Sequence, residues 1–286
     1  MATFTNQATL TLGGRTINSN IATGNLIETL SLTKTPVSST YEPNDNVTYV
    51  LNLINSGNTA FTDLTVTDNL GSYQLASGTT VYPLTYTAGS VQYYINGALQ
   101  TAPTATAGPP LTISGISVPA NSNATIIYNA DVNEYAPLAA ASSIQNEASV
   151  TGTGVSSAVT ANAAVTAASS PTLNIIKTID PANVTQNSRV TYTFRIQNTG
   201  NTPVTSADNA AVRDLFNPIL SDIAVAFNST AWASPTNYTY NTSTGLFETV
   251  AGQITVPAAT YSQDPTTGIV TVVPGESVLT VTGTIR

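Results

Sequence analysis

The stretch VTYVLNLINSGNT, at residues 47–59, is nearly repeated as VTYTFRIQNTGNT at residues 190–202. Both stretches begin with alternating apolar and polar residues, the period-two pattern of a half-buried β-strand. Both end in Asn, Gly and Thr, and Asn and Gly are typical of turns. Upstream, LSLTKTP from Leu30 matches LNIIKTI from Leu173, so that Lys34 and Lys177 hold the same position in each copy. The chain therefore contains two copies of one β-rich domain.

The repeat extends downstream of this stretch. DLTVTDNL at residues 63–70 matches AVRDLF at residues 211–216, with an insertion in the second copy near residues 206–210. ISVPANSNATIIYNADV at residues 116–132 is aligned with VVPGESVLTVTGTIR at residues 272–286, where the second copy stops.

Only the first copy continues, through SIQNEASVTG at residues 143–152 and SAVTANAAV at residues 157–165. A similar pair of segments, FTNQATLTL and TINSNIATG, lies near the N-terminus at residues 4–12 and 16–24. This match aligns Phe4 with Ile144, Asn6 with Asn146, Ala8 with Ala148 and Leu10 with Val150. The two strands that the second copy lacks are thus expected in an N-terminal hairpin.

Several short strands in each copy, with turn signals such as Asn96-Gly97, predict an all-β chain of two tandem immunoglobulin-like antiparallel β-sandwich domains. We expect a donor hairpin at residues 1–26, a first domain at 27–169 and an incomplete second domain at 170–286 that a donated hairpin completes. The rival partition joins each hairpin to the lysine strand that follows it, which gives domains at about 1–131 and 132–286.

The composition excludes several classes of function. The chain has no His and no Cys, which removes the usual metal ligands, thiol nucleophiles and disulfides. Its formal net charge is −8, which argues against nucleic acid as a partner. No apolar run is long enough to span a membrane. We predict no cofactor, no metal site and no enzymatic activity beyond a reaction of the chain with itself.

A lysine strand, the pattern VTYxxxxxNxGNT and the segment VTDNL together resemble an immunoglobulin-like repeat, a domain of unknown function found in tandem in bacterial and archaeal surface and fibre proteins. The resemblance covers most of both copies. It implies an extracellular location, on a cell or spore surface, and a stalk-like or fibre-forming role.

Lys34 and Lys177 are the only lysines of the chain. Because side chains on a strand alternate between faces, Lys34 is expected to face the core with Leu30 and Leu32, and Lys177 with Leu173 and Ile175. The same parity turns two asparagines and two aspartates inward: Asn6, Asn146, Asp68 and Asp214.

A Lys, an Asn and an Asp in an apolar interior can react with one another. Burial lowers the pKa of a lysine and raises that of an aspartate, so that a neutral amine can attack a carboxamide with loss of ammonia. The pattern resembles the Lys-Asn isopeptide bonds of Gram-positive pilin and adhesin domains. We predict Lys34-Asn146 and Lys177-Asn6 bonds, with Asp68 and Asp214 as assisting acids and Glu147 facing outward. The alternative is an ordinary buried Lys-Asp ion pair beside an Asn.

These expectations predict a structural subunit of an extracellular fibre or pilus. Its partners are copies of itself, joined head to tail by donor-strand complementation. The alternative is an adhesin or stalk segment with two self-contained domains, which binds a surface ligand through loops such as residues 227–240.

Overall fold

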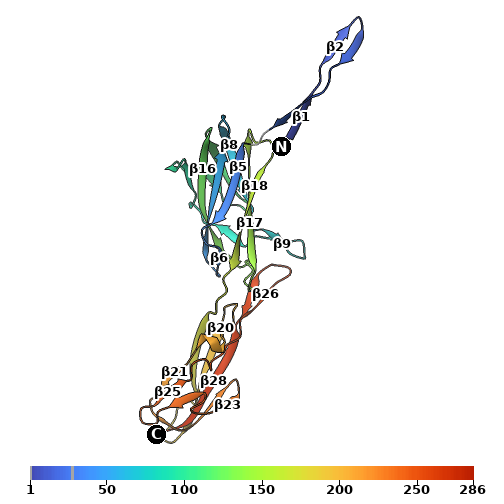
Figure 1. Ribbon diagram of the computed structural model, residues 1–286. Coiled ribbons are helices and arrows are strands. Elements are labelled where there is room, and N and C mark those ends of the chain that lie inside the picture. Colours follow the sequence, from blue (N-terminus) through green and yellow to red (C-terminus); the bar gives the residue numbers. More distant parts are fainter. Residues whose placement is uncertain (1, 27–28) are drawn as a thin grey trace. The chain divides into compact units, whose positions relative to one another are not determined.

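The structure, a computed structural model, describes residues 2–26 and 29–286 (Figure 1). Within those residues the regular structure is β-strand apart from one 3₁₀ turn, Ser206–Asp208, so the prediction of an all-β fold is confirmed. The described chain forms two compact units, the first mainly from residues up to 165 and the second mainly from residues after it. The predicted boundary at residues 26 and 27 involves Ile27, which lies outside the described residues.

The first unit contains a β-sandwich of two antiparallel sheets. One sheet has the order β13-β12-β16-β7-β5, and β11 also pairs with β16. Its strands are β5 (Leu30–Pro36), β7 (Asn46–Asn55), β11 (Leu84–Tyr86), β12 (Gln92–Ile95), β13 (Ala98–Leu99) and β16 (Ser122–Val132).

The other sheet has the order β14-β15-β8-β17-β18-β6. Its strands are β6 (Thr40–Tyr41), β8 (Phe61–Asp68), β14 (Thr104–Thr106), β15 (Leu111–Val118), β17 (Ser143–Thr153) and β18 (Val159–Ala167). A small pair, β9 (Tyr73–Gln74) and β10 (Thr80–Val81), lies outside both sheets. Because β17 pairs with β8, the hairpin of β17 and β18 completes the first sandwich. The rival partition would have placed that hairpin in the second.

Alternate residues of the long strands form the core between the two sheets. In β7 the buried side chains are Val47, Tyr49, Leu51 and Leu53, and in β8 they include Leu64 and Val66. β17 buries every second residue from Ile144 to Val150. The period-two pattern of the sequence therefore matches the observed faces.

The second unit repeats the first sheet but not the whole of the other one. Its five-stranded sheet has the order β19-β20-β28-β22-β23, whereas the sheet that packs against it has only β21, β25 and β24. These strands are β19 (Leu173–Asp180), β20 (Arg189–Asn198), β21 (Arg213–Leu215), β22 (Leu220–Phe227), β23 (Thr230–Trp232), β24 (Tyr238–Tyr240), β25 (Leu246–Thr249) and β28 (Gly275–Ile285). No described strand takes the place of β17 or β18 in this unit.

The repeated NxGNT motif holds a turn through its first Asn. The Oδ1 atom of Asn55 accepts a hydrogen bond from the N–H of Gly57 at 2.9 Å. Its Nδ2 donates to the carbonyls of Thr59, at 2.8 Å, and Pro119, at 2.9 Å. The second copy repeats these contacts around Asn198, with partners Gly200, Thr202 and Pro257. The first Asn of the motif is therefore a buried polar side chain whose hydrogen bonds are satisfied in both copies.

One part of the predicted repeat alignment is wrong. β28 is the counterpart of β16, since Gly275 pairs with Asn198 as Ser122 pairs with Asn55. However, the hydrogen-bond acceptor that corresponds to Pro119 is Pro257, not a residue of the VVPG segment. A hairpin of β26 (Thr260–Gln263) and β27 (Val270–Val273) is inserted between this proline and β28. The sequence alignment ran through this insertion and shifted the register.

The N-terminal segment forms a long two-stranded hairpin, drawn in dark blue in Figure 1. β1 (Ala2–Asn6) pairs with β4 (Ala22–Leu26), and β2 (Thr9–Leu12) pairs with β3 (Arg15–Asn18). Gly13 and Gly14 both have positive φ at the tip, as a two-residue hairpin turn requires. Its apolar side chains, which include Phe4, Leu10 and Ile17, are exposed. The hairpin therefore has an apolar face without a core of its own.

Candidate functional site

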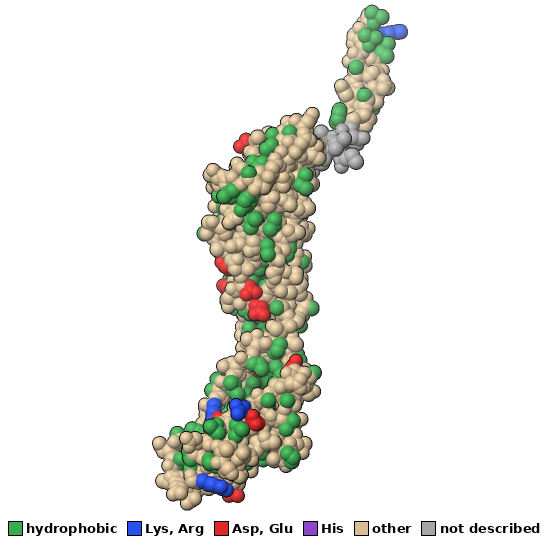
Figure 2. Space-filling view, turned by 60° about the vertical axis from the view of Figure 1, so that its left-hand side comes forward, with side chains coloured by type: hydrophobic (Ala, Val, Ile, Leu, Met, Phe, Trp, Pro, Cys, Tyr) green, Lys and Arg blue, Asp and Glu red, His purple; other side chains and the backbone are tan. Residues whose placement is uncertain are grey.

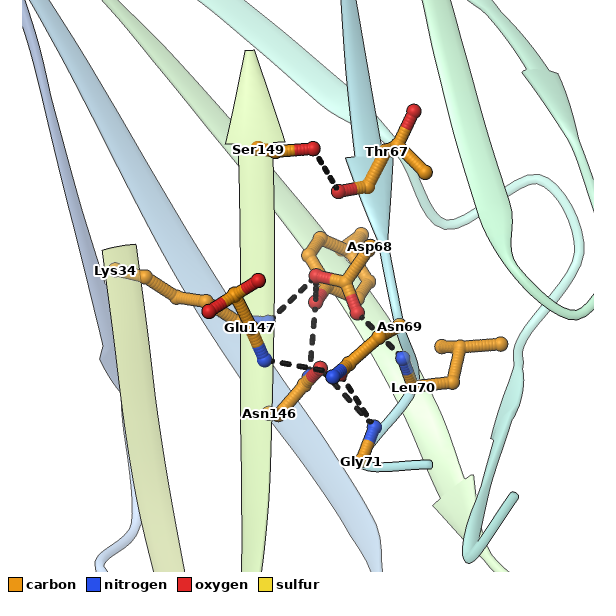
Figure 3. Close-up of polar contacts among 10 residues, drawn as sticks. Lys34, Thr67, Asp68, Asn69, Leu70, Gly71, Asn146, Glu147 and Ser149 are labelled. Atoms are coloured by element: carbon orange, nitrogen blue, oxygen red, sulfur yellow. Dashed lines mark hydrogen bonds and ion pairs between the residues drawn. The ribbon is translucent and has the colours of Figure 1, made fainter. Parts of the chain in front are cut away.

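The first sandwich buries Lys34 against Asp68. Lys34 alternates with exposed residues of β5 and shares the inward face of Leu30 and Leu32. Its Nζ lies 2.5 Å from Oδ2 of Asp68, and neither side chain is exposed to solvent. Figure 3 shows the lysine of β5 reaching the aspartate at the end of β8. Each charge is thus compensated by the other, as a buried ion pair requires.

Asn146 of β17 is joined to this pair by hydrogen bonds. The hydroxyl of Tyr128, on β16, donates to Asp68 Oδ2 at 2.5 Å. The Nδ2 of Asn146 donates to the Tyr128 oxygen at 3.3 Å, and the N–H of Gly71 donates to Asn146 Oδ1 at 3.2 Å. Figure 3 shows Asp68 and Asn146 facing each other, with Gly71 beside the asparagine. Lys34, Asp68, Tyr128 and Asn146 therefore form one buried polar cluster.

The surroundings favour a neutral amine on Lys34. Burial lowers the pKa of Lys34 from 10.5 to about 8, and the adjacent Asp68 carboxylate opposes that shift. The ring of Tyr49 lies below the amine, with its centroid 4.7 Å from Nζ. The lowered pKa makes the neutral, nucleophilic form of Lys34 more accessible than that of an exposed lysine.

The structure brings together the three residues that the sequence predicted here: Lys34, Asp68 and Asn146. Glu147, the next residue of β17, is exposed, as parity required. Tyr128 was missed. Its alternation with Ala124, Ile126 and Ala130 marks it as a core residue, but no sequence pattern shows that its hydroxyl meets Asp68.

The second sandwich holds a similar pair in a more open setting. Lys177 of β19 forms an ion pair with Asp214 Oδ2, and its Nζ lies 4.7 Å from the centroid of the Tyr192 ring. The predicted orientation of Lys177 is therefore observed, but its predicted burial is not. Its side chain is 40% exposed and that of Asp214 is 17% exposed.

The exposure of Lys177 follows from the short sheet opposite β19. β21 is the counterpart of β8, and it pairs on one side with β25 as β8 pairs with β15. On its other side β8 carries β17, whereas no described strand pairs with that edge of β21. All eight residues of β19 are consequently exposed, including Leu173 and Ile175, while their counterparts Leu30 and Leu32 are buried.

Two further differences separate the sites. Val281 faces Tyr192 across the strand pair, as Tyr128 faces Tyr49, so the second site has no hydroxyl at this position. Phe216 instead packs on Tyr192, with ring centroids 4.8 Å apart. Asn6, the asparagine predicted for this site, is exposed in the N-terminal hairpin opposite Ala22.

In the loop suggested as a ligand surface, the aromatic side chains pack on the sheet, whereas residues 228–231 and 233–236 are exposed. Phe227 and Tyr238 are buried, and Trp232 packs on Phe227 with ring centroids 4.9 Å apart. Packing of the sheet therefore accounts for the aromatic residues near residues 227–240.

Other site types are not found among the described residues. These residues contain no cluster of His, Cys, Asp or Glu that could hold a metal ion. They also contain no helix that is long and apolar enough to cross a membrane. The face in Figure 2 carries few charged side chains, in keeping with a charged fraction of 8%.

Comparison with known proteins gave distant structural matches only. No known family model and no curated protein matches the chain. A variant of the major pilin subunit BcpA of Bacillus cereus is 12% identical, with a TM-score of 0.39 over 96% of this chain and 73% of that one. The pilus backbone protein RrgB of Streptococcus pneumoniae is 11% identical, with a TM-score of 0.33 over 86% of this chain and 56% of that one. A family 123 glycoside hydrolase of Clostridium perfringens is 9% identical, with a TM-score of 0.31 over 49% of this chain.

The chain spans only 27% of the hydrolase and about half of the pilus backbone protein. Similarity at this level identifies neither a family nor an activity.

Proposed function

We propose that the protein is the structural subunit of an extracellular fibre, in which the N-terminal hairpin of one subunit completes the second sandwich of the next. One observation carries this proposal: β17 occupies one edge of β8, whereas no strand of the described residues pairs with the corresponding edge of β21. The same chain has a spare hairpin whose sequence matches β17 and β18. Addition of a strand to an open sheet edge is a known mode of protein recognition.

The first sandwich supplies the register of the proposed contact. There Ala148 pairs with Asp68, and Val150 pairs with Val66. By the internal repeat, Ala8 would pair with Asp214 and Leu10 with Val212. Asn6 would then lie beside Lys177 and Asp214, as Asn146 lies beside Lys34 and Asp68.

Burial of apolar surface favours this contact. The hairpin exposes Phe4 and Leu10, and the second sandwich exposes Leu173, Ile175 and Leu215. A shallow hollow lined by residues that include Leu215 and Leu246 lies beside β21. Each such side chain contributes about 1.5–3 kcal/mol when it becomes fully buried. Docking would also cover an open sheet edge, which otherwise invites aggregation.

The contact is head to tail, because the hairpin and the open sandwich are different surfaces of one chain. Heterologous contacts that do not close into a ring generate filaments. Copies of the chain are thus the partners that this proposal requires, and an extracellular surface is the setting in which such a fibre would serve.

We further propose that each complete site forms an amide bond. Lys34 would join Asn146 within the subunit, assisted by Asp68, with release of ammonia. Lys177 would join Asn6 of the neighbouring subunit, assisted by Asp214. Before docking, Lys177 is half exposed and paired with Asp214, so the second reaction would wait until the hairpin covers the lysine.

Electron microscopy of purified protein tests the assembly. We expect filaments from the full chain and dispersed subunits after deletion of residues 1–26. Leu10→Asp should also prevent filaments, because docking would bury an unpaired charge at a cost of roughly several kcal/mol. Thr11→Asp, which adds the same charge on the outward face, should leave filaments intact. Filaments from the truncated chain would refute hairpin donation.

A further inference from the structure

Tyr128 connects the two groups that must exchange a proton in the proposed Lys34-Asn146 reaction. Its hydroxyl contacts Asp68 Oδ2 at 2.5 Å and Asn146 Nδ2 at 3.3 Å. Nδ2 is the atom that leaves as ammonia. Tyr128 is completely buried, so water does not compete for these contacts.

Gly71 contacts the other polar atom of the same amide. Its N–H donates to Asn146 Oδ1 at 3.2 Å. Negative charge develops on this oxygen when an amine attacks the amide carbon. The asparagine is therefore held at both ends, with a proton carrier at the nitrogen and a hydrogen-bond donor at the oxygen.

We propose that Tyr128 is a catalytic residue of this bond formation, which carries a proton from Asp68 to the departing nitrogen of Asn146 while the Gly71 N–H stabilises the oxyanion. This inference rests on the proposed Lys34-Asn146 bond. Nothing in the proposed assembly of subunits depends on it.

The proposed reaction between Lys34 and Asn146 has four steps, in which every atom and proton is accounted for. Lys34 first gives a proton to Asp68 and becomes a neutral amine. Its nitrogen attacks Cγ of Asn146, and the new C–N bond places the negative charge on Oδ1. Asp68 then passes its proton to the Tyr128 oxygen while the Tyr128 hydroxyl proton moves to Nδ2. When Oδ1 re-forms the carbonyl, the Cγ–Nδ2 bond breaks and ammonia leaves, and the surplus proton on the former lysine nitrogen returns to Asp68.

The second sandwich provides an internal comparison. It keeps the lysine, the aspartate and the tyrosine below the lysine, as Lys177, Asp214 and Tyr192. It has Val281 at the position of Tyr128. Of the two sites, only the first therefore has a tyrosine hydroxyl at this position to pass a proton on. The subunit-joining reaction at the second site should consequently be the slower of the two.

Intact-mass measurement of the full chain tests the role of Tyr128. Samples of wild type, Tyr128→Phe and Tyr49→Phe are withdrawn over time after purification, and Lys34→Ala marks the mass of the unreacted chain. Loss of a general acid typically slows a reaction by about 10²–10⁴-fold, so Tyr128→Phe should lose ammonia at least roughly 100-fold more slowly than wild type. Tyr49 stacks on Tyr128 and its buried hydroxyl lies near Asn146, but among the described residues that hydroxyl is not hydrogen-bonded to the proton donor Asp68, so Tyr49→Phe should react close to wild type.

A gain-of-function variant examines the same hydroxyl in the other sandwich. Val281→Tyr combined with Phe216→Leu supplies the hydroxyl and removes the ring that packs on Tyr192. Assembled subunits of this variant should join covalently at least about ten-fold faster than wild type.

The outcomes separate the two proposals. A wild-type subunit that retains its plain sequence mass rules out the Lys34-Asn146 bond itself. If wild type and a folded Tyr128→Phe subunit lose ammonia equally fast, the bond forms but Tyr128 has no catalytic role in it. Equal slowing by Tyr49→Phe would also overturn it, because the effect would then follow from the loss of any buried hydroxyl beside Asn146 and not from the proton chain through Tyr128.

Discussion

Lys34 is the residue on which the proposed chemistry of the first sandwich depends. An ammonium group in an apolar interior is costly, and here one carboxylate and two aromatic rings are its surroundings. Conversion to an amide removes the charge of Lys34 altogether. The free energy of unfolding should then respond to pH in different ways before and after the reaction.

Asn146→Ala, which keeps Lys34 as a free amine, should make the first sandwich more stable as pH rises from 8 to 10. The folded pKa of Lys34 is about 8 and its ordinary value is 10.5. Between these values the unfolded chain binds a proton that the folded chain has lost, so the free energy of unfolding increases with pH by at most about 1.4 kcal/mol per unit. Burial raises the pKa values of Tyr41, Tyr49 and Tyr128, which oppose this trend only at higher pH.

Urea unfolding at a series of pH values measures this slope. Trp232, the single tryptophan, reports the second sandwich by fluorescence, so a transition seen only by circular dichroism belongs to the first. Wild type should show no such rise if the proposed amide has replaced the titrating amine of Lys34. An equal slope in wild type and variant would contradict the proposed amide.

At the scale of residues, the sequence predicted which face a side chain points to better than it predicted how deeply that side chain is buried. Strand parity placed Lys34, Asp68 and Asn146 on inward faces, since alternation depends only on the strand itself. It could not predict that Lys177 is exposed, because burial depends on the sheet opposite. It also missed Tyr128, whose role depends on a contact between strands that lie 60 residues apart in the chain.

At the scale of elements, the proposal pairs the open edge of β21 with the N-terminal hairpin. β8 and β17 show what the completed arrangement looks like, with Ser149 opposite Thr67 on the outward side. The corresponding pair in the proposed contact between subunits would be Thr9 and Arg213. Directly opposed residues of an antiparallel pair have Cα atoms about 4.5–5.5 Å apart, within the range of a disulfide.

We predict that Thr9→Cys chains and Arg213→Cys chains, when mixed and oxidised, form a disulfide between subunits. The chain has no cysteine of its own, so only the introduced cysteines can form disulfides. Thr11→Cys mixed with Arg213→Cys is the matched control, displaced by two residues on the same face, and should cross-link far less. The measurement is the yield of the disulfide-linked peptide by mass spectrometry. Equal yields from both mixtures would show that the hairpin does not dock in this register.

The elements also show where reasoning from the repeat failed. The NxGNT turns and their flanking strands were placed correctly, because a buried Asn fixes the same hydrogen bonds in both copies. The alignment before β28 was wrong, since the inserted hairpin of β26 and β27 carries a Val-Pro pair that imitates the real turn. A pattern of two or three residues is too short to distinguish them.

For the whole molecule, the described chain contains one complete sandwich, one sandwich with an open edge and one N-terminal hairpin. The all-β architecture and the unequal completeness of the two sandwiches are observed. If Lys177 joins Asn6 of the next subunit, the fibre is a continuous covalent chain that denaturants cannot separate.

Denaturing electrophoresis of boiled wild-type filaments, followed by peptide mapping, tests this most directly. We predict a ladder of multimers that builds up after assembly, since Val281 offers no hydroxyl to speed the reaction, and a peptide in which Asn6 is linked to Lys177. Asn6→Ala and Lys177→Ala should collapse the ladder to a monomer band, whereas Asn18→Ala, on the outward face of the same hairpin, should preserve it. A single monomer band from aged wild-type filaments would contradict the covalent fibre, and a peptide that links Asn6 to Lys34 would show that the hairpin completes the first sandwich instead.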